Sequence, residues 1–245
     1  MDAWFAATAG SPPDAVRLFC FAPAGSDASF FGPWRDRLRP EIDVCPVQLP
    51  GRGPRSSQTP YTRADELVRD LVTELRRWPD RPYAFFGHSL GAALAYEVAC
   101  GLAAAEAIGP RALIVSGRRS PYTARRALRI FALPDDEFVA HLVRLGGLPP
   151  AVLGRTELYR FLLPALRADF AVDESYAPQR PAPGLSCPVL AVTGTDDPLA
   201  GPADLAAWQE VTSGDFAQQA FAGGHFYLRP APEELFETIR KSVAG

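Results

Sequence analysis

Short, unbroken runs of apolar residues recur along this chain and alternate with segments in which apolar residues return every three or four positions. Most runs are apolar at every position, which is typical of parallel strands covered on both faces. They predict strands at 16–21, 42–47, 83–86, 112–115, 189–193 and 216–221. Helical spacing predicts helices at 63–78, 90–105 and 233–243. This alternation favours the α/β class, with a mostly parallel, doubly wound sheet.

One connection is much longer than a parallel crossover requires. Residues 117–186 separate the fourth and fifth predicted strands, whereas about a dozen residues are enough. Within it, 134–145 and 156–172 have helical spacing. We therefore expect 1–245 to form a single domain with a helical lid inserted at about 117–186, over the carboxyl edge of the sheet, where open α/β sheets bind ligands. The alternative is a packing insertion without substrate contact.

Composition excludes some classes of partner. The chain is 47% hydrophobic and 22% charged with a net charge of −3, so it is expected to be a soluble globular protein with no electrostatic attraction for nucleic acid. The N-terminus lacks the basic and apolar regions of a signal peptide. The most apolar segment, 92–108, carries Glu97 and Glu106 and fits a core helix better than a membrane span. We expect a cytoplasmic monomer with no membrane contact.

The cysteines stand far apart in apolar surroundings, with no CxxC pair and no histidine nearby. They are Cys20, Cys45, Cys100 and Cys187. Buried free thiols are expected rather than a disulfide or a metal site. We predict no metal and no cofactor.

A nucleophile elbow joins the third predicted strand to the helix after it. Gly87-His88-Ser89-Leu90-Gly91 matches the GxSxG pattern, in which a serine sits on a sharp strand-to-helix turn. Gly87 and Gly91 are small where strand and helix nearly touch. The five residues alone are weak evidence, but a buried strand before them and a helix after them make the signal strong. Ser89 is the predicted nucleophile.

A serine nucleophile needs a base, and three histidines compete for that role. His225 follows two glycines in a loop between the last predicted strand and the last predicted helix, where it can reach the sheet edge. We predict that His225 is the base. The sharp turn should aim His88 away from Ser89, and His141 lies in a lid helix, so both are expected to have structural roles.

The carboxylate that holds the base should lie between serine and histidine in the chain, at the end of a strand. Asp196 and Asp197 both follow the fifth predicted strand. We favour Asp197, because the aspartate three residues after the strand-end glycine is the usual member, with Asp196 as the alternative. The order Ser89, Asp197, His225 is that of α/β-hydrolases.

Two backbone N–H groups are predicted to form the oxyanion hole. One belongs to Leu90, directly after the nucleophile at the positive end of its helix. The other should come from the loop after the first strand, where Ala24 is the candidate because Pro23 has no N–H.

Several motifs along the chain resemble those of a known family. They are Leu18-Phe19-Cys20-Phe21, Ala24-Gly25, Pro50-Gly51-Arg52-Gly53, the elbow, Ser116-Gly117-Arg118-Arg119, Leu145-Gly146-Gly147, Pro164-Ala165-Leu166-Arg167-Ala168-Asp169-Phe170 and Gly223-Gly224-His225-Phe226-Tyr227-Leu228. Over about 16–228, the chain resembles the type II thioesterases of the α/β-hydrolase superfamily, the stand-alone editing hydrolases of polyketide synthases and nonribosomal peptide synthetases. The lid motif separates this family from general esterases. One departure is that Pro23 and Ser26 replace the histidine and the second glycine of the family's Pro-His-Ala-Gly-Gly loop.

The resemblance implies a substrate and a partner. The substrate would be a stalled or aberrant acyl group on the phosphopantetheine arm of an acyl or peptidyl carrier protein, removed through an acyl-enzyme. A thioester suits this site, because a thiolate with a reference pKa of about 8.5 leaves with less acid assistance than an amine. The alternatives are a small-molecule carboxylesterase or lipase, and a non-catalytic binding protein on a hydrolase scaffold.

The lid suggests residues for the acyl chain and for the carrier. Bulky apolar side chains are expected to close over an acyl chamber, namely Phe138, Leu142, Phe161 and Leu162. A basic cluster at the start of the lid would suit an acidic carrier protein. Its proposed docking residues are Arg125, Arg126 and Arg129, near Arg118 and Arg119. The alternative for these arginines is ordinary solvated surface.

Overall fold

Parallel strands form one sheet in the order β2-β1-β3-β4-β5-β6 in the part of the chain that the computed structural model describes. The described residues are 4–5, 12–78, 81–123, 129–147, 156–178 and 184–244, with the backbone alone for 156–161. The strands are β1 (Val16–Phe21), β2 (Ile42–Pro46), β3 (Tyr83–His88), β4 (Leu113–Ser116), β5 (Val189–Gly194) and β6 (Phe216–Phe221). The predicted α/β class and all six predicted strands are confirmed.

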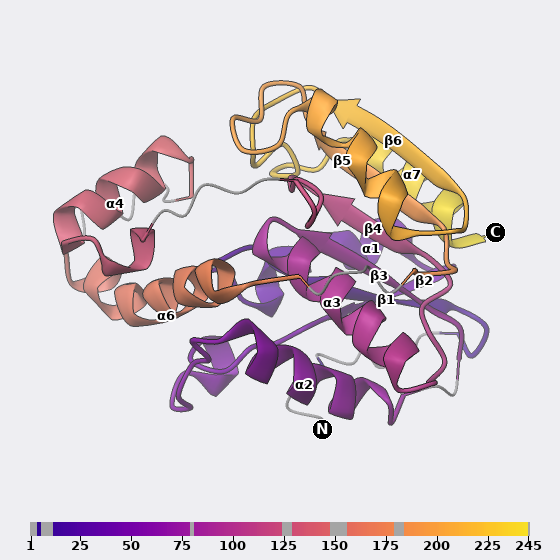
Figure 1. Ribbon diagram of the computed structural model, residues 1–245, viewed down its shortest axis with the longest axis horizontal. Helices are drawn as coiled ribbons and strands as arrows, with labels where there is room; N and C mark the ends of the chain where they lie inside the picture. The colour runs from indigo at the N-terminus through magenta and orange to yellow at the C-terminus, as the bar shows by residue number, and fades with distance from the viewer. Residues whose placement is uncertain are drawn as a thin grey trace.

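Helices follow most strands, as the alternation predicts (Figure 1). The α-helices are α1 (Trp34–Leu38), α2 (Ala64–Leu75), α3 (Leu90–Ala104), α4 (Asp135–Arg144), α6 (Thr156–Ser175) and α7 (Glu233–Ala244). Short 3-10 helices are η1 (Ala28–Phe31), η2 (Gly53–Arg55), η3 (Ile130–Ala132), η4 (Pro202–Asp204) and η5 (Ala206–Val211). Strand β3 runs two residues beyond its predicted end, because Gly87 and His88 still pair with β4.

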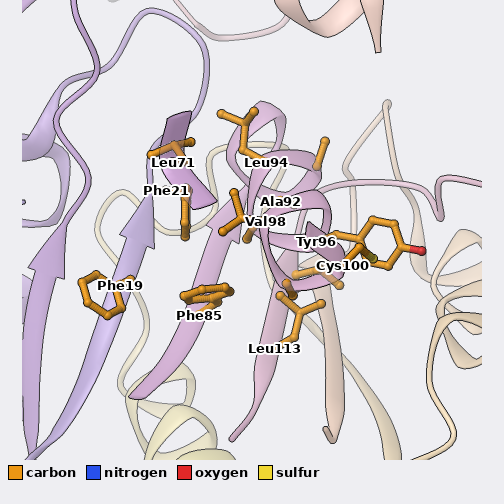
Figure 2. Packing of buried hydrophobic residues seen from close by; sticks show 14 of the residues in the cluster. Phe19, Phe21, Leu71, Phe85, Ala92, Leu94, Tyr96, Val98, Cys100 and Leu113 are labelled. Carbon is orange, nitrogen blue, oxygen red and sulfur yellow. The ribbon is translucent and has the colours of Figure 1, made fainter. Parts of the chain in front are cut away.

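Alternate side chains of the strands fill two hydrophobic cores, one on each face of the sheet. On one face, Phe19, Phe21 and Phe85 belong to a core shared with α2 and α3. Figure 2 shows Phe21 and Phe85 near Val98 of α3, with Phe19 farther from that helix. On the other face, strand residues that include Leu18 and Phe86 pack against α1 and α7. Burial on both faces explains why the strands are apolar throughout rather than at every second position.

Helices α4 and α6 stand together beyond the sheet, apart from the helices that cover its faces (Figure 1). Their apolar side chains form a small core of their own, built from Phe138, Leu142, Leu163 and Leu166. Val172 near the carboxyl-terminal end of α6, and Tyr176 directly after that helix, belong to the main core. The predicted lid helices therefore exist, anchored at one end of α6. No helix in the described ranges is long and apolar enough to cross a membrane.

Candidate active site

The turn between β3 and α3 holds Ser89 in a strained backbone conformation. Its φ is 55° and its ψ is −116°, a region that costs a non-glycine residue of the order of 1–3 kcal/mol and clusters at functional sites. The Ser89 N–H donates to the Ser116 carbonyl at 2.8 Å, which ties the turn to β4. Leu90 opens α3 directly after it, so the Leu90 N–H lies at the positive end of a 15-residue helix.

The two elbow glycines are required by close backbone approach. A Cβ on Gly91 would lie 2.0 Å from the carbonyl oxygen of Phe21, and a Cβ on Gly87 would lie 2.2 Å from the carbonyl oxygen of Gly91. Both contacts are with rigid backbone, so no larger residue fits. The elbow therefore has the geometry that the sequence pattern predicts.

His225 and Asp197 form a buried pair at the carboxyl edge of the sheet. The Nδ1 of His225 lies 2.8 Å from Oδ2 of Asp197. His225 exposes only 5% of its surface and Asp197 only 6%. Burial alone would raise the pKa of Asp197, but hydrogen bonds from His225 and from the N–H groups of Leu199 and Ala200 lower it below its usual value. An ionised Asp197 accepts a hydrogen bond from Nδ1–H of His225, so the neutral imidazole carries its lone pair on Nε2.

The neighbouring Asp196 is placed differently. It is exposed, and its carboxylate accepts a hydrogen bond from the Thr195 hydroxyl at 3.1 Å. Thr193 Oγ1, at the end of β5, lies 3.2 Å from Asp197 Oδ2 and so supports Asp197 from within the sheet. Of the two candidate carboxylates, Asp197 is the one that faces the histidine.

His88 lies beside the candidate base rather than beside the nucleophile. Its ring centroid is 4.8 Å from that of His225, and its side chain is fully buried. Its Nδ1 lies 2.9 Å from the Ser116 hydroxyl, which lies 2.8 Å from the Tyr227 hydroxyl. Burial, followed by the nearby His225 and Arg229, lowers the pKa of His88 well below its usual range. The imidazole is therefore neutral at neutral pH, in keeping with a structural role.

The loop after β1 forms a tight turn at the candidate oxyanion hole. The Ser26 N–H donates to the Pro23 carbonyl at 3.1 Å, and Gly25 has a φ of +77°, which together define a type II turn with Ala24 and Gly25 at its centre. The replacements at positions 23 and 26 are compatible with this geometry, because only the third turn position needs a positive φ. Ala24 and Leu90 line the same cavity as Ser89.

This cavity, of about 580 Å³, lies between the sheet edge and the lid. Its lining combines the candidate catalytic residues Ser89 and His225 with lid side chains such as Leu142, Leu166 and Phe170. Such a volume suits a small-molecule substrate. The lid touches the substrate space, so the alternative of a packing insertion is not supported. In the described ranges, no group of three or more histidine, cysteine or acidic side chains could hold a metal ion.

The predicted lid residues have different positions. Leu142 lines the cavity, whereas Phe138 packs beneath it against Phe170, with ring centroids 5.3 Å apart. Leu162 is half-buried beside the lid core. The side chain of Phe161 lies outside the described residues. Leu166 and Phe170 line the cavity and were missed as chamber residues, although both belong to the lid motif.

Arg118, which the sequence places in the basic cluster at the start of the lid, lines the cavity. Its side chain is 13% exposed and donates to Asp173 of α6 at 2.6 Å, because the lid folds back over the end of β4. Arg129 is exposed, and Arg125 and Arg126 lie outside the described residues. Sequence reasoning missed the polar residues of α6. The recurrence of Asp169 and Asp173 at helical spacing, with Tyr176 directly after the helix, was the signal that could have found them.

Comparisons with known proteins agree with this architecture. Residues 16–243 match the thioesterase domain family. The chain is 40% identical over 230 residues to thioesterase PikA5 of Streptomyces venezuelae, covering 94% of this chain and 81% of that protein. The type II thioesterase BorB from the borrelidin biosynthetic cluster superposes with a TM-score of 0.90 at 40% identity over 99% of this chain and 98% of BorB. RedJ, a thioesterase from the prodiginine pathway of Streptomyces coelicolor, superposes with a TM-score of 0.86 at 37% identity, over 96% of this chain and 94% of RedJ.

The fold and the site define an α/β-hydrolase with a serine elbow and an inserted lid. The chain belongs to the thioesterase domain family, and its relatives include type II thioesterases of polyketide and nonribosomal peptide pathways. It is a thioesterase, a hydrolase of acyl thioesters. The alternatives of a general esterase and of a non-catalytic binding protein are set aside by this membership.

Proposed function

We propose that this thioesterase removes stalled or aberrant acyl groups from the phosphopantetheine arm of acyl or peptidyl carrier proteins, through a triad of Ser89, His225 and Asp197. The observation that carries the proposal is that the buried His225–Asp197 pair and the strained Ser89 turn meet at one cavity of about 580 Å³. Two similar proteins, BorB from the borrelidin biosynthetic cluster and the type II thioesterase YbtT from the yersiniabactin NRPS/PKS pathway, support this class of partner.

The residues give each step of a serine mechanism. His225 Nε2 takes the hydroxyl proton of Ser89 as Oγ attacks the thioester carbonyl carbon. The resulting oxyanion would be bound by the N–H groups of Leu90 and Ala24, and the ionised Asp197 would stabilise the imidazolium. The carbon–sulfur bond then breaks, and the thiolate takes the proton from His225. Water, deprotonated by the same Nε2, attacks the acyl-serine, which releases the free acid and restores Ser89.

The substrate test compares two carriers of the same acyl group. We expect hydrolysis of a panel of acyl groups on holo carrier protein, and slower hydrolysis of the same groups on free pantetheine, because the carrier adds binding energy remote from the reacting bond. Ser89→Ala is the control for spontaneous hydrolysis. Faster hydrolysis of simple oxygen esters than of any thioester would contradict the proposed substrate class.

The basic cluster of Arg125, Arg126 and Arg129 is proposed as the carrier contact. Replacing all three with alanine should raise KM for acyl-carrier substrates, with the larger increase at low salt, because exposed opposite charges are screened over about 10 Å at 0.1 M. Activity on an acyl-pantetheine should be unchanged. A parallel loss on both substrates would show that these arginines support the lid instead of the partner.

A further inference from the structure

A buried ion pair joins the lid to the turn that carries Ala24. Asp169 of α6 faces Arg52, which lies in the loop after β2, and their side chains are only 3% and 9% exposed. The pairing is bidentate. Nη2 of Arg52 donates to Oδ1 of Asp169 at 2.7 Å, and Nη1 donates to Oδ2. Two-point contacts of this kind fix orientation as well as distance.

The same carboxylate also binds the turn itself. The Gly25 N–H donates to Oδ2 of Asp169 at 2.7 Å, and Nη1 of Arg52 donates to the Ser26 carbonyl at 3.5 Å. Leu166, one helical turn before Asp169, covers Gly25 so closely that a Cβ there would lie 2.2 Å from Cδ2 of Leu166. Two side chains from one face of the lid helix therefore seat on one residue of the turn.

This arrangement determines which N–H groups of the turn remain for a substrate. Pro23 has no N–H, and the N–H of Gly25 is bound to the lid. Ala24 lies between them and lines the cavity with Ser89. Its orientation depends on the turn, and the turn is held by a residue 144 positions away in the sequence.

We propose that Asp169 is a positioning residue that orients the oxyanion turn through Gly25 and Arg52, so that the oxyanion hole is complete only while helix α6 is docked. Docking of the lid and assembly of the catalytic site are then one event. Substrate that closes the lid would thereby activate the enzyme that hydrolyses it. The inference rests on the serine mechanism proposed above, and not on the identity of the carrier.

The test separates binding of the ground state from binding of a tetrahedral adduct. Two acyl ligands of matched chain length are used, a trifluoromethyl ketone that adds to Ser89 and an unreactive thioether. In Asp169→Asn, we expect kcat on an acyl-pantetheine and affinity for the ketone to fall about 100-fold, the usual effect of losing one oxyanion donor. KM and affinity for the thioether should change less than about twofold, because the chamber is unaltered.

Asp135→Asn is the matched control. Asp135 of α4 accepts a hydrogen bond from Arg167 of α6 at 2.6 Å, and its side chain is 66% exposed. It lies outside the cavity lining and the oxyanion turn, so the control should retain both affinities. Arg52→Lys is the second variant. It keeps the charge but loses the two-point contact, and we expect a loss of about tenfold in ketone affinity alone.

Four results would overturn the proposal. An unchanged ketone affinity in a folded Asp169→Asn would exclude a positioning role, and equal losses for ketone and thioether would show general lid packing. If Asp169→Asn does not fold, an unchanged ratio of the two affinities in Arg52→Lys excludes the role. If the wild-type enzyme forms no ketone adduct that depends on Ser89, the proposed serine mechanism fails together with this inference. A Ser89-dependent adduct whose affinity Asp169→Asn leaves unchanged would overturn this inference alone.

Discussion

The sheet and the lid of this thioesterase both bury aromatic side chains completely, but they join the rest of the molecule in different ways. Phe85 of the sheet belongs to a core that extends over β1 to β5 and over helices α2 and α3. Phe138 of the lid belongs to a small separate core. The lid reaches the rest of the chain through α6, both by polar contacts of Asp169 with Arg52 and Asp173 with Arg118 and by the packing of Val172 in the main core.

This difference indicates that the sheet and the lid have different roles in catalysis. Apolar burial is non-directional and is proportional to area, so the extended sheet core holds the elbow and the His225 loop in fixed positions. The apolar core of the lid is small, and regions with few buried apolar contacts open at lower free energy than an extended core. The chamber wall can therefore move while Ser89, His225 and Asp197 remain in place.

The largest expected effect concerns the fixed region. Ser89→Ala and His225→Ala should each lower kcat by about 10⁴- to 10⁶-fold without unfolding the protein, and the double variant should lose little more, because triad residues act as a unit. Steady-state hydrolysis of an acyl-pantetheine measures this. Asp197→Asn should cost about 10⁴-fold, with Asp196→Asn as the matched control. A larger loss of activity in Asp196→Asn than in Asp197→Asn would assign the role of the triad carboxylate to Asp196.

The next effect compares the two cores directly. Phe85→Ala should lower the free energy of global unfolding by about 3–5 kcal/mol, because it leaves a cavity in the extended core. Phe138→Ala removes an equally buried ring but should lower the global value by less than about 1 kcal/mol, because the lid can open before the sheet unfolds. Urea denaturation followed by tryptophan fluorescence gives both values. Similar losses would mean that lid and sheet unfold together.

Amide hydrogen exchange can sharpen the same comparison. The described lid residues from 132 to 147 and from 162 to 172 should exchange faster than α3, and a covalent acyl-phosphonate on Ser89 should slow them by about tenfold or more, because lids commonly open on the microsecond to millisecond scale. Exchange in α3 serves as the internal control. Equal protection with and without the label would identify the lid as fixed packing.

The smallest effect is a pH dependence from the buried imidazole of the sheet edge. Because the pKa of His88 is lowered in the folded state by burial and by His225 and Arg229, only the unfolded chain gains a proton there as pH falls below about 6.5. Stability present above pH 6.5 should therefore be lost toward pH 5, by up to about 1.4 kcal/mol per pH unit. The free energy of unfolding, measured from pH 7 to pH 5, should fall less steeply with decreasing pH in His88→Asn than in the wild type.

The half-buried His141 of the lid provides the control for that slope. Burial and then Arg144 lower its pKa in the same direction, so His141→Asn should flatten the slope less than His88→Asn. An equal change of slope in both variants would show that folding lowers the pKa of the two histidines to the same degree.

The strands, the elbow and the identity of the histidine could be predicted from the sequence, because each leaves a local signal. An apolar run defines a strand buried on both faces, and two glycines around Ser89 reflect contacts within a few residues of the turn. Even the alternation that places His225 near Ser89 is a property of chain order in parallel α/β sheets.

Tertiary structure decided what depends on distant partners. Its position after the strand-end glycine favours Asp197 over Asp196, but only the packed structure shows that Asp197 is buried against His225 while Asp196 is exposed. Arg118 is an ordinary surface charge by its neighbours, and only the return of α6 brings Asp173 to it. Asp169 likewise acquires its partners from the loops after β1 and β2. Such contacts have no period and no fixed spacing along the chain, because they form between elements that are distant in sequence. Local sequence patterns predict the elements themselves but not which residues of different elements come into contact.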